Sequence, residues 1–141
     1  MTPPRVGDPI PSLTLPPLSR ATLALYAGGS GDHVPLHIDS AFAKRAGYSD
    51  VFMHGMLGSA YVARALTEWI PQDAVRDLEV RFVAITYPDE VLTAGGVVSE
   101  VGVDGIPNRC RVDLQLVNSV GERKLTGFAV LDHPELRRCN G

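Results

Sequence analysis

The longest apolar stretch of the chain runs from Gly55 to about Trp69 and has the spacing of a helix. Apolar side chains would cover nearly the whole circumference of this helix: Met56, Leu57, Ala60, Tyr61, Val62, Ala63, Ala65 and Leu66. A helix that is apolar on most sides is stable in water only when other structure covers it. The pattern therefore predicts a long helix over residues 55–69 that another layer of the fold wraps.

The second half of the chain has the pattern of that covering layer. Apolar and polar residues alternate with a period of two in residues 78–82 and 111–116, and less regularly in residues 91–101 and 123–131. Such alternation is typical of half-buried strands, and the Pro, Gly, Asp and Asn residues between these segments are typical of turns. One buried helix followed by antiparallel strands predicts an α+β domain with a single sheet.

The N-terminal part is expected to be less regular. Residues 1–18 are rich in proline, which favours an edge strand or an extended arm over a helix. Ser19 has the place of an N-cap before a short helix over residues 20–27, and Gly28 and Gly29 are expected to end that helix.

Length and composition narrow the class of protein. The 141 residues suit one domain, over residues 1–141, with a single core. Hydrophobic residues make up 45% of the chain and charged residues 21%, as in ordinary globular proteins. The net charge of −3 and the scattered basic residues argue against a nucleic-acid partner. No apolar run has the length of a signal peptide core or a membrane span, so we expect a cytoplasmic protein without membrane contact.

The two cysteines do not indicate a metal site or redox chemistry. Cys110 lies inside a strand-like segment and Cys139 lies near the end of the chain, without the spacing of metal ligands. We therefore expect structural thiols and no bound metal.

Asp32 and His37 form the first candidate for catalysis. They are five residues apart, and a fully extended chain would separate them by roughly 16 Å. Gly31 permits backbone angles that other residues avoid, and Pro35 fixes its own φ, so the sequence favours a chain that folds back between the two. A carboxylate and an imidazole at the two ends of one turn are typical of a general acid/base pair.

Gly55 is the second candidate. The first N–H groups of a helix have no acceptor within the helix and lie at the positive end of its dipole. A helix that begins at Gly55 could therefore bind an oxygen that gains negative charge during a reaction. His54, just before this glycine, is expected to shape the turn into the helix rather than to act as a base or a metal ligand.

These segments together resemble a known family. Residues 26–37 read Tyr-Ala-Gly-Gly-Ser-Gly-Asp-His-Val-Pro-Leu-His, and residues 54–57 read His-Gly-Met-Leu. Both resemble the signature of the MaoC-like, (R)-specific enoyl-thioester hydratases and dehydratases, and the similarity extends to Arg81-Phe82 and Pro88-Asp89. The resemblance implies a hotdog fold, in which a curved antiparallel sheet wraps a long central helix.

The resemblance also implies a reaction. Water adds reversibly across the C2–C3 double bond of a trans-2-enoyl thioester, or leaves an (R)-3-hydroxyacyl thioester in the reverse direction. Asp32 and His37 match the family's catalytic pair, which activates one water, and the N–H of Gly55 matches the donor to the thioester carbonyl. The family needs no metal or redox cofactor, and its substrate is carried by coenzyme A or by an acyl carrier protein. We expect a homodimer or a higher homo-oligomer, because a single sheet leaves an edge strand unpaired.

Two positions depart from the family pattern. Val34 stands where family members commonly have Asn, and we expect it to contact the acyl chain. Some members have a Ser further along the helix, where this chain has Ala63, although Ser59 lies nearby. Met56 and Ser59 are the expected substrate contacts on the helix.

Two other functions stay open at this point. A hotdog thioesterase would use the Asp32 carboxylate to direct water at the thioester carbonyl, but hydrolysis does not need the second acid/base that His37 provides. A non-catalytic partner subunit of a hetero-oligomeric hydratase could have lost both residues, and only the unusual Val34 favours it.

Overall fold

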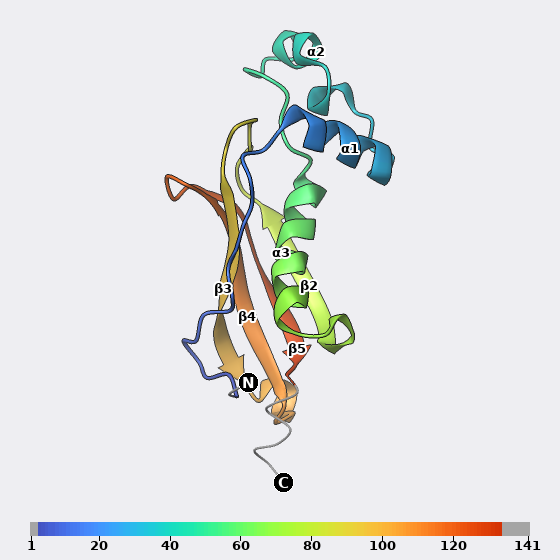
Figure 1. Cartoon of the computed structure of the whole chain (residues 1–141). Coiled ribbons are helices and arrows are strands. Elements are labelled where there is room, and N and C mark those ends of the chain that lie inside the picture. Colours follow the sequence, from blue (N-terminus) through green and yellow to red (C-terminus); the bar gives the residue numbers. More distant parts are fainter. Residues whose placement is uncertain (1–2, 134–141) are drawn as a thin grey trace.

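The computed structural model describes residues 3–133, which form one antiparallel sheet with a long helix across one of its faces (Figure 1). The strands are β1 (Leu13–Thr14), β2 (Val75–Phe82), β3 (Leu92–Val101), β4 (Arg109–Asn118) and β5 (Arg123–Asp132), in the spatial order β1-β3-β4-β5-β2. The helices are α1 (Arg20–Ser30), α2 (Ser40–Arg45) and α3 (Gly55–Trp69). The predicted α+β fold with a single sheet is confirmed.

Helix α3 has the bounds that its apolar pattern predicts. Leu57, Val62 and Leu66 are buried on the side that packs on the sheet. The other side is less covered than expected, because Met56 is 60% exposed and Arg64 and Glu68 are also exposed. A sheet of five strands reaches only one side of a helix, so part of the apolar surface of α3 stays open within the described residues.

The alternation along the strands divides the sheet into an inner and an outer face. In β4, the inward residues Val112, Leu114 and Leu116 are buried in the core. The residues between them are polar and point to the outer face. Cys110 is fully buried, and burial raises the pKa of its thiol to about 11, as suits a structural residue. Cys139 lies outside the described residues.

The first helix ends later than the sequence suggested. Gly28 and Gly29 stay within α1, and the expectation that they end it was wrong. Gly31 ends the helix instead, with a left-handed φ of 78° and an N–H that donates to the carbonyl of Ala27. Glycine adopts a positive φ without strain, so the helix ends at Gly31, where the backbone has this angle.

The N-terminal arm and the short helices frame one end of α3. Leu13 pairs with Ala94 of β3, which confirms the predicted edge strand. α1 and α2 lie at the end of the molecule where α3 begins (Figure 1). Asp50, in the loop before α3, accepts hydrogen bonds from Arg20 and from Ser40, so one carboxylate ties both helices to that loop. None of the helices within residues 3–133 is long and apolar enough to cross a membrane.

Neighbouring glycines of β3 provide a test of the packing. A Cβ on Gly96 would lie 2.5 Å from the backbone oxygen of Asp113, whereas a Cβ on Gly95 would meet nothing closer than 3.9 Å. We expect Gly96→Ala to lower the free energy of unfolding by about 1–3 kcal/mol, because a backbone atom of the next strand must move. Gly95→Ala, the matched control, should leave it unchanged or raise it by up to about 1 kcal/mol. Urea unfolding measures both, and equal effects would contradict the packing described here.

Candidate active site

The turn that carries Asp32 begins at the end of α1. Asp32 Oδ1 accepts a hydrogen bond from the N–H of Val34 at 3.2 Å, and the N–H of Asp32 donates to Ser30 Oγ at 3.2 Å. Pro35 then starts a single 3-10 turn over Pro35–His37. The chain therefore folds back between Asp32 and His37, as Gly31 and Pro35 led us to expect.

The hydrogen bond on the far side of the His37 ring defines its chemistry. His37 Nδ1 lies 2.7 Å from the carbonyl oxygen of Phe52, and a carbonyl can only accept, so Nδ1 carries the proton. In the neutral ring, Nε2 then has a free lone pair. This atom lies 4.0 Å from Asp32 Oδ2, which is too long for a direct hydrogen bond. Two acceptors at this separation suit one bridging water that donates a hydrogen bond to each.

His54 contacts both Asp32 and His37. Its ring stacks on the His37 ring with centroids 3.8 Å apart, and its Nε2–H donates to the backbone carbonyl of Asp32 at 3.1 Å. The edge of Tyr26 packs against it from another side, with ring centroids 4.8 Å apart. One side chain therefore positions both the backbone of Asp32 and the ring of His37.

The environment of His54 keeps it neutral. The residue is 2% exposed, and its Nδ1 has no hydrogen-bond partner within residues 3–133. Burial is the main cause that lowers the pKa of His54, and positive charge on His37 lowers it further, against the opposing effect of the Asp32 carbonyl. A neutral His54 donates through Nε2 and leaves Nδ1 as a buried acceptor.

Gly55 begins α3 directly after this stack. No side chain caps the helix, and the N–H of Leu57 donates back to the carbonyl of His54 at 3.1 Å, so the N–H groups of Gly55 and Met56 are the ones left for an outside acceptor. A Cβ on Gly55 would lie 3.0 Å from the ring of Phe82, which packs against the glycine from the end of β2. The absence of a side chain therefore lets the sheet approach the positive end of the helix dipole.

A narrow cavity extends from Gly55 between the first turns of α3 and the sheet. Its volume is about 30 Å³. It is lined by Met53, Gly55, Gly58, Phe82, Ala84, Thr86, Leu116, Lys124 and Leu125. The lining is mostly apolar, so a carbonyl bound at the start of α3 could place attached carbon atoms in it.

The other predicted contact residues lie outside this cavity. Val34 is about half exposed in the turn, and only its backbone is tied to Asp32. Met56 points toward solvent from α3. Ser59 is buried in the helix, and its hydroxyl donates to the sulfur of Met56 at 3.9 Å. The structure therefore brings Asp32, His37 and the start of α3 together and leaves these three residues at the margin.

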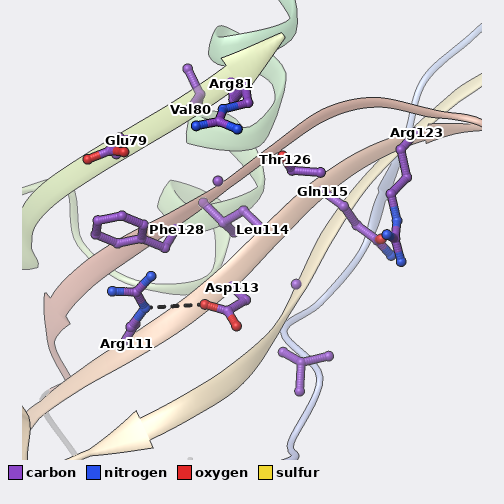
Figure 2. Close-up of a pocket in the computed structure, with 13 residues that line it drawn as sticks. Glu79, Val80, Arg81, Arg111, Asp113, Leu114, Gln115, Arg123, Thr126 and Phe128 are labelled. Atoms are coloured by element: carbon purple, nitrogen blue, oxygen red, sulfur yellow. Dashed lines mark hydrogen bonds and ion pairs between the residues drawn. The ribbon is translucent and has the colours of Figure 1, made fainter. Parts of the chain in front are cut away.

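A larger hollow lies on the outer face of the sheet and holds none of the candidate residues (Figure 2). Its volume is about 640 Å³. Arg111 pairs there with Asp113 at 3.3 Å and lies over the ring of Phe128. Arg111 and Asp113, joined by a dashed line in Figure 2, thus pair with each other away from Asp32 and His37.

Known proteins resemble the chain in sequence and in structure. The family model for the MaoC-like domain matches residues 4–116. The chain belongs to the MaoC-like family. Fatty acid synthase subunit beta of Saccharomyces cerevisiae is 29% identical over 130 residues, which are 90% of this chain and 6% of that protein. Peroxisomal enoyl-CoA hydratase 2 of Arabidopsis thaliana is 30% identical over 80 residues, which are 55% of this chain and 24% of that relative.

Solved structures of MaoC-like proteins share the fold. The (R)-hydratase from A. caviae involved in PHA biosynthesis superposes with a TM-score of 0.81 at 24% identity and covers 92% of this chain and 97% of its own. R-hydratase PhaJ1 from Pseudomonas aeruginosa superposes with a TM-score of 0.81 at 26% identity. The match covers 93% of this chain and 83% of the PhaJ1 chain. The hotdog fold that the resemblance implied is confirmed.

This MaoC-like site also offers a possible set of metal ligands. Asp32, His37 and His54 each have one ligand atom within 4.8 Å of the others. Imidazole and carboxylate groups suit divalent transition metals. Two ring nitrogens already donate to the carbonyls of Phe52 and Asp32, so His37 Nε2 and His54 Nδ1 are the nitrogens left for a metal.

Reasoning from the sequence missed three contributors to the site: the carbonyl of Phe52, Thr86 and Lys124. A backbone carbonyl leaves no sequence signal. Lys124 precedes Leu125 at an outward position of its strand pattern, so the sequence gives no sign that it is buried. Thr86 has no sequence signal that we recognise.

The burial of His54 predicts a dependence of stability on pH. Its folded pKa lies below the unfolded value near 6.5, so its stabilising contribution is fully present above about pH 6.5 and is lost as the pH falls through the folded pKa. We expect Tm to fall less steeply between pH 7 and pH 5 in His54→Phe, which keeps a stacked ring but cannot titrate. His33→Gln, a change at an exposed histidine, should keep the wild-type slope. Identical slopes for all three proteins would exclude a buried, neutral His54.

Proposed function

We propose that this protein catalyses the reversible hydration of trans-2-enoyl thioesters. The observation that carries the proposal is the 4.0 Å separation of Asp32 Oδ2 and His37 Nε2, beside a helix that begins at Gly55 without a side-chain cap. The family and the relative named enoyl-CoA hydratase 2 support the same reaction. The acyl group is carried by coenzyme A or by an acyl carrier protein.

The geometry supports one mechanism. A water between the two groups donates to the Asp32 carboxylate and to His37 Nε2. As its oxygen bonds to C3, the C2–C3 π bond breaks, His37 takes the water's proton, and the electron pair moves toward the thioester oxygen. The N–H of Gly55 stabilises the negative charge on that oxygen. The proton that His37 took then passes to C2, so one water has been added in total and His37 is neutral again. Dehydration follows the same steps backwards.

The two alternatives fit the site less well. A thioesterase needs one carboxylate near the carbonyl carbon, whereas Asp32 here shares a water site with an imidazole whose tautomer is fixed by Phe52. A non-catalytic partner subunit has no need for that arrangement. Val34, the residue that favoured this second alternative, contributes its backbone N–H to the Asp32 turn, which any residue except proline can do.

The proposed hydratase acts as a homodimer or a higher homo-oligomer. Strand β2 lies at the edge of the described sheet, and an unpaired edge favours pairing with a second copy. Next to it, Met56, Phe82, Val83 and Ile85 are exposed apolar residues near the start of α3. A second copy that covers this margin would also close the site from water.

The first test of this function is catalysis itself. Purified protein should remove the absorbance of the enoyl-thioester band of but-2-enoyl-CoA, with and without a chelator, because the mechanism uses no metal. Asp32→Asn and His37→Gln should each lower kcat/KM at least about 100-fold, as expected for the loss of a positioned acid or base. Asp32→Asn should change Tm little, because the Asp32 side chain is about half exposed. His37→Gln gives up the stack on His54, so circular dichroism checks that this variant is folded.

The double variant distinguishes a shared water from independent roles. Since both groups act on one water, Asp32→Asn with His37→Gln should be scarcely slower than either single variant. Losses that multiply would contradict the shared water. Folded wild-type protein that leaves the enoyl band intact would remove the hydratase proposal, and activity lost with the chelator and restored by a divalent metal would replace the water site with a metal site.

The oligomer has its own test. Light scattering at assay concentration should give at least twice the monomer mass, because the exposed margin beside β2 is apolar. Val83→Asp should shift the mass toward the monomer and lower activity. Phe82→Asp should also shift the mass, but only its mass is compared, because Phe82 packs against Gly55 in the site. Val120→Asp, at an exposed apolar residue of the β4–β5 turn, is the matched control and should change neither. A fully active monomer would contradict a site that needs a second copy.

A further inference from the structure

The loop between β2 and β3 holds the chain that leads into the candidate site. Residues 83–91 form neither helix nor strand, so no regular ladder of backbone hydrogen bonds fixes them. Within this loop, the carbonyl of Thr86 accepts the N–H of Met53 at 2.8 Å. Met53 stands directly before His54, which stacks on the acid/base pair, and Gly55, which begins α3. The position of the Thr86 backbone therefore affects the site.

An ion pair holds the chain on both sides of Thr86. On one side, Lys124 Nζ donates to the carbonyl of Ile85 at 2.7 Å. On the other side, Glu90 Oε2 accepts the N–H of Tyr87 at 2.6 Å. Lys124 and Glu90 pair with each other at 2.9 Å. The peptide groups before and after Thr86 are therefore bound by two side chains that also bind each other.

The peptide group between Thr86 and Tyr87 is the link to the site. Its N–H donates to the Glu90 carboxylate, and its oxygen accepts from the N–H of Met53. A peptide group is planar, so a partner that fixes the direction of its N–H also fixes the direction of its oxygen. The Glu90 carboxylate therefore orients the acceptor that holds Met53.

Both members of the ion pair keep their charge in this place. Lys124 is 5% exposed, and the Glu90 side chain is 21% exposed. Burial raises the pKa of Glu90, but hydrogen bonds from Asn118, from Lys124 and from a backbone N–H outweigh it, so this pKa lies below its usual value. Burial lowers the pKa of Lys124, but hydrogen bonds to Glu122 and Glu90 outweigh it and raise this pKa. Because Glu122 also bonds to Lys124, the ammonium keeps a carboxylate partner when the charge of Glu90 is removed.

We propose that Glu90, paired with Lys124, is a positioning residue for the site. Through the peptide group that follows Thr86 it holds Met53, and it thereby fixes the direction of the Gly55 N–H at the start of α3. Glu90 acts through the backbone and takes no part in the proton transfers. Its effect on the rate rests on the proposed hydratase function, whereas its hold on Met53 does not.

Removal of one charge tests the effect on the rate. Glu90→Gln keeps the size of the side chain, but its amide has one oxygen for the three donors that the carboxylate serves. With but-2-enoyl-CoA we expect kcat to fall at least about tenfold and KM to change less than about threefold. A displaced oxyanion donor weakens the transition state more than it weakens substrate binding.

Asp132→Asn is the matched control. Asp132 is the last residue of β5, at the other end of the strand from Lys124, and its carboxylate accepts from Arg109 at 2.9 Å and from Arg76 at 2.7 Å. This variant also takes the charge from a carboxylate in an ion-pair network. We expect it to lower Tm to a similar extent as Glu90→Gln and to leave kcat unchanged.

Hydrogen exchange measured by NMR tests the hold on Met53 without catalysis. In Glu90→Gln the N–H of Met53 should exchange at least about tenfold faster than in the wild type, because its acceptor is no longer oriented. In Asp132→Asn it should exchange within about threefold of the wild-type rate, which excludes a general loss of stability as the cause. If Glu90→Gln does not fold, Glu90→Asp gives the same comparison, since it keeps the charge but is one carbon too short to reach all three donors.

The outcomes separate this inference from the proposed function. A lower Tm in Glu90→Gln with unchanged kcat, or unchanged exchange of Met53, would make the ion pair a structural contact only and overturn the inference. An equal loss of kcat in Asp132→Asn would do the same, and each of these results leaves the hydratase function intact. Folded wild-type protein that does not hydrate but-2-enoyl-CoA removes the proposed function, and the exchange of Met53 alone then decides whether Glu90 positions the start of α3.

Discussion

The hydrogen bond from His54 to the backbone carbonyl of Asp32 joins two parts of the molecule that the chain builds separately. Asp32 and His37 belong to the turns after α1, whereas Gly55 belongs to the helix that packs on the sheet. His54 reaches from the second part to the first and stacks on His37 as it does so. His54 therefore links the position of the candidate residues Asp32 and His37 to the start of α3.

The sheet secures the other end of that arrangement. The Phe82 ring lies against Gly55, and the backbone of Thr86 holds Met53, one residue before His54. The loop that leads into α3 is therefore held on one side by the sheet and on the other by the Asp32 turn. Contacts on both sides of this loop therefore hold the candidate residues in place, as the proposed hydration requires for the orientation of one water.

The sequence predicts the periodic parts of this structure well and the contacts between them poorly. The bounds of α3 follow from its apolar pattern, and Asp32, His37 and Gly55 follow from motifs whose residues are close in sequence. Gly31 rather than Gly28 ends α1 because the deciding property is a backbone angle. The hydrogen bond of His37 to the carbonyl of Phe52 and the position of Thr86 arise from segments that meet only in the folded chain, so no local sequence pattern predicts them.

The polar groups buried near the site differ in whether they have a hydrogen-bond partner. Lys124, which lines the cavity, forms an ion pair with Glu90, as structural groups do. His54 Nδ1 and Thr86 Oγ1 have no partner in the described part of the chain. Both unpaired atoms belong to residues beside Gly55 or at the cavity that starts there. Within the described residues, the carboxylate and ammonium groups near the start of α3 are therefore paired, whereas these two neutral polar atoms are left without a hydrogen-bond partner.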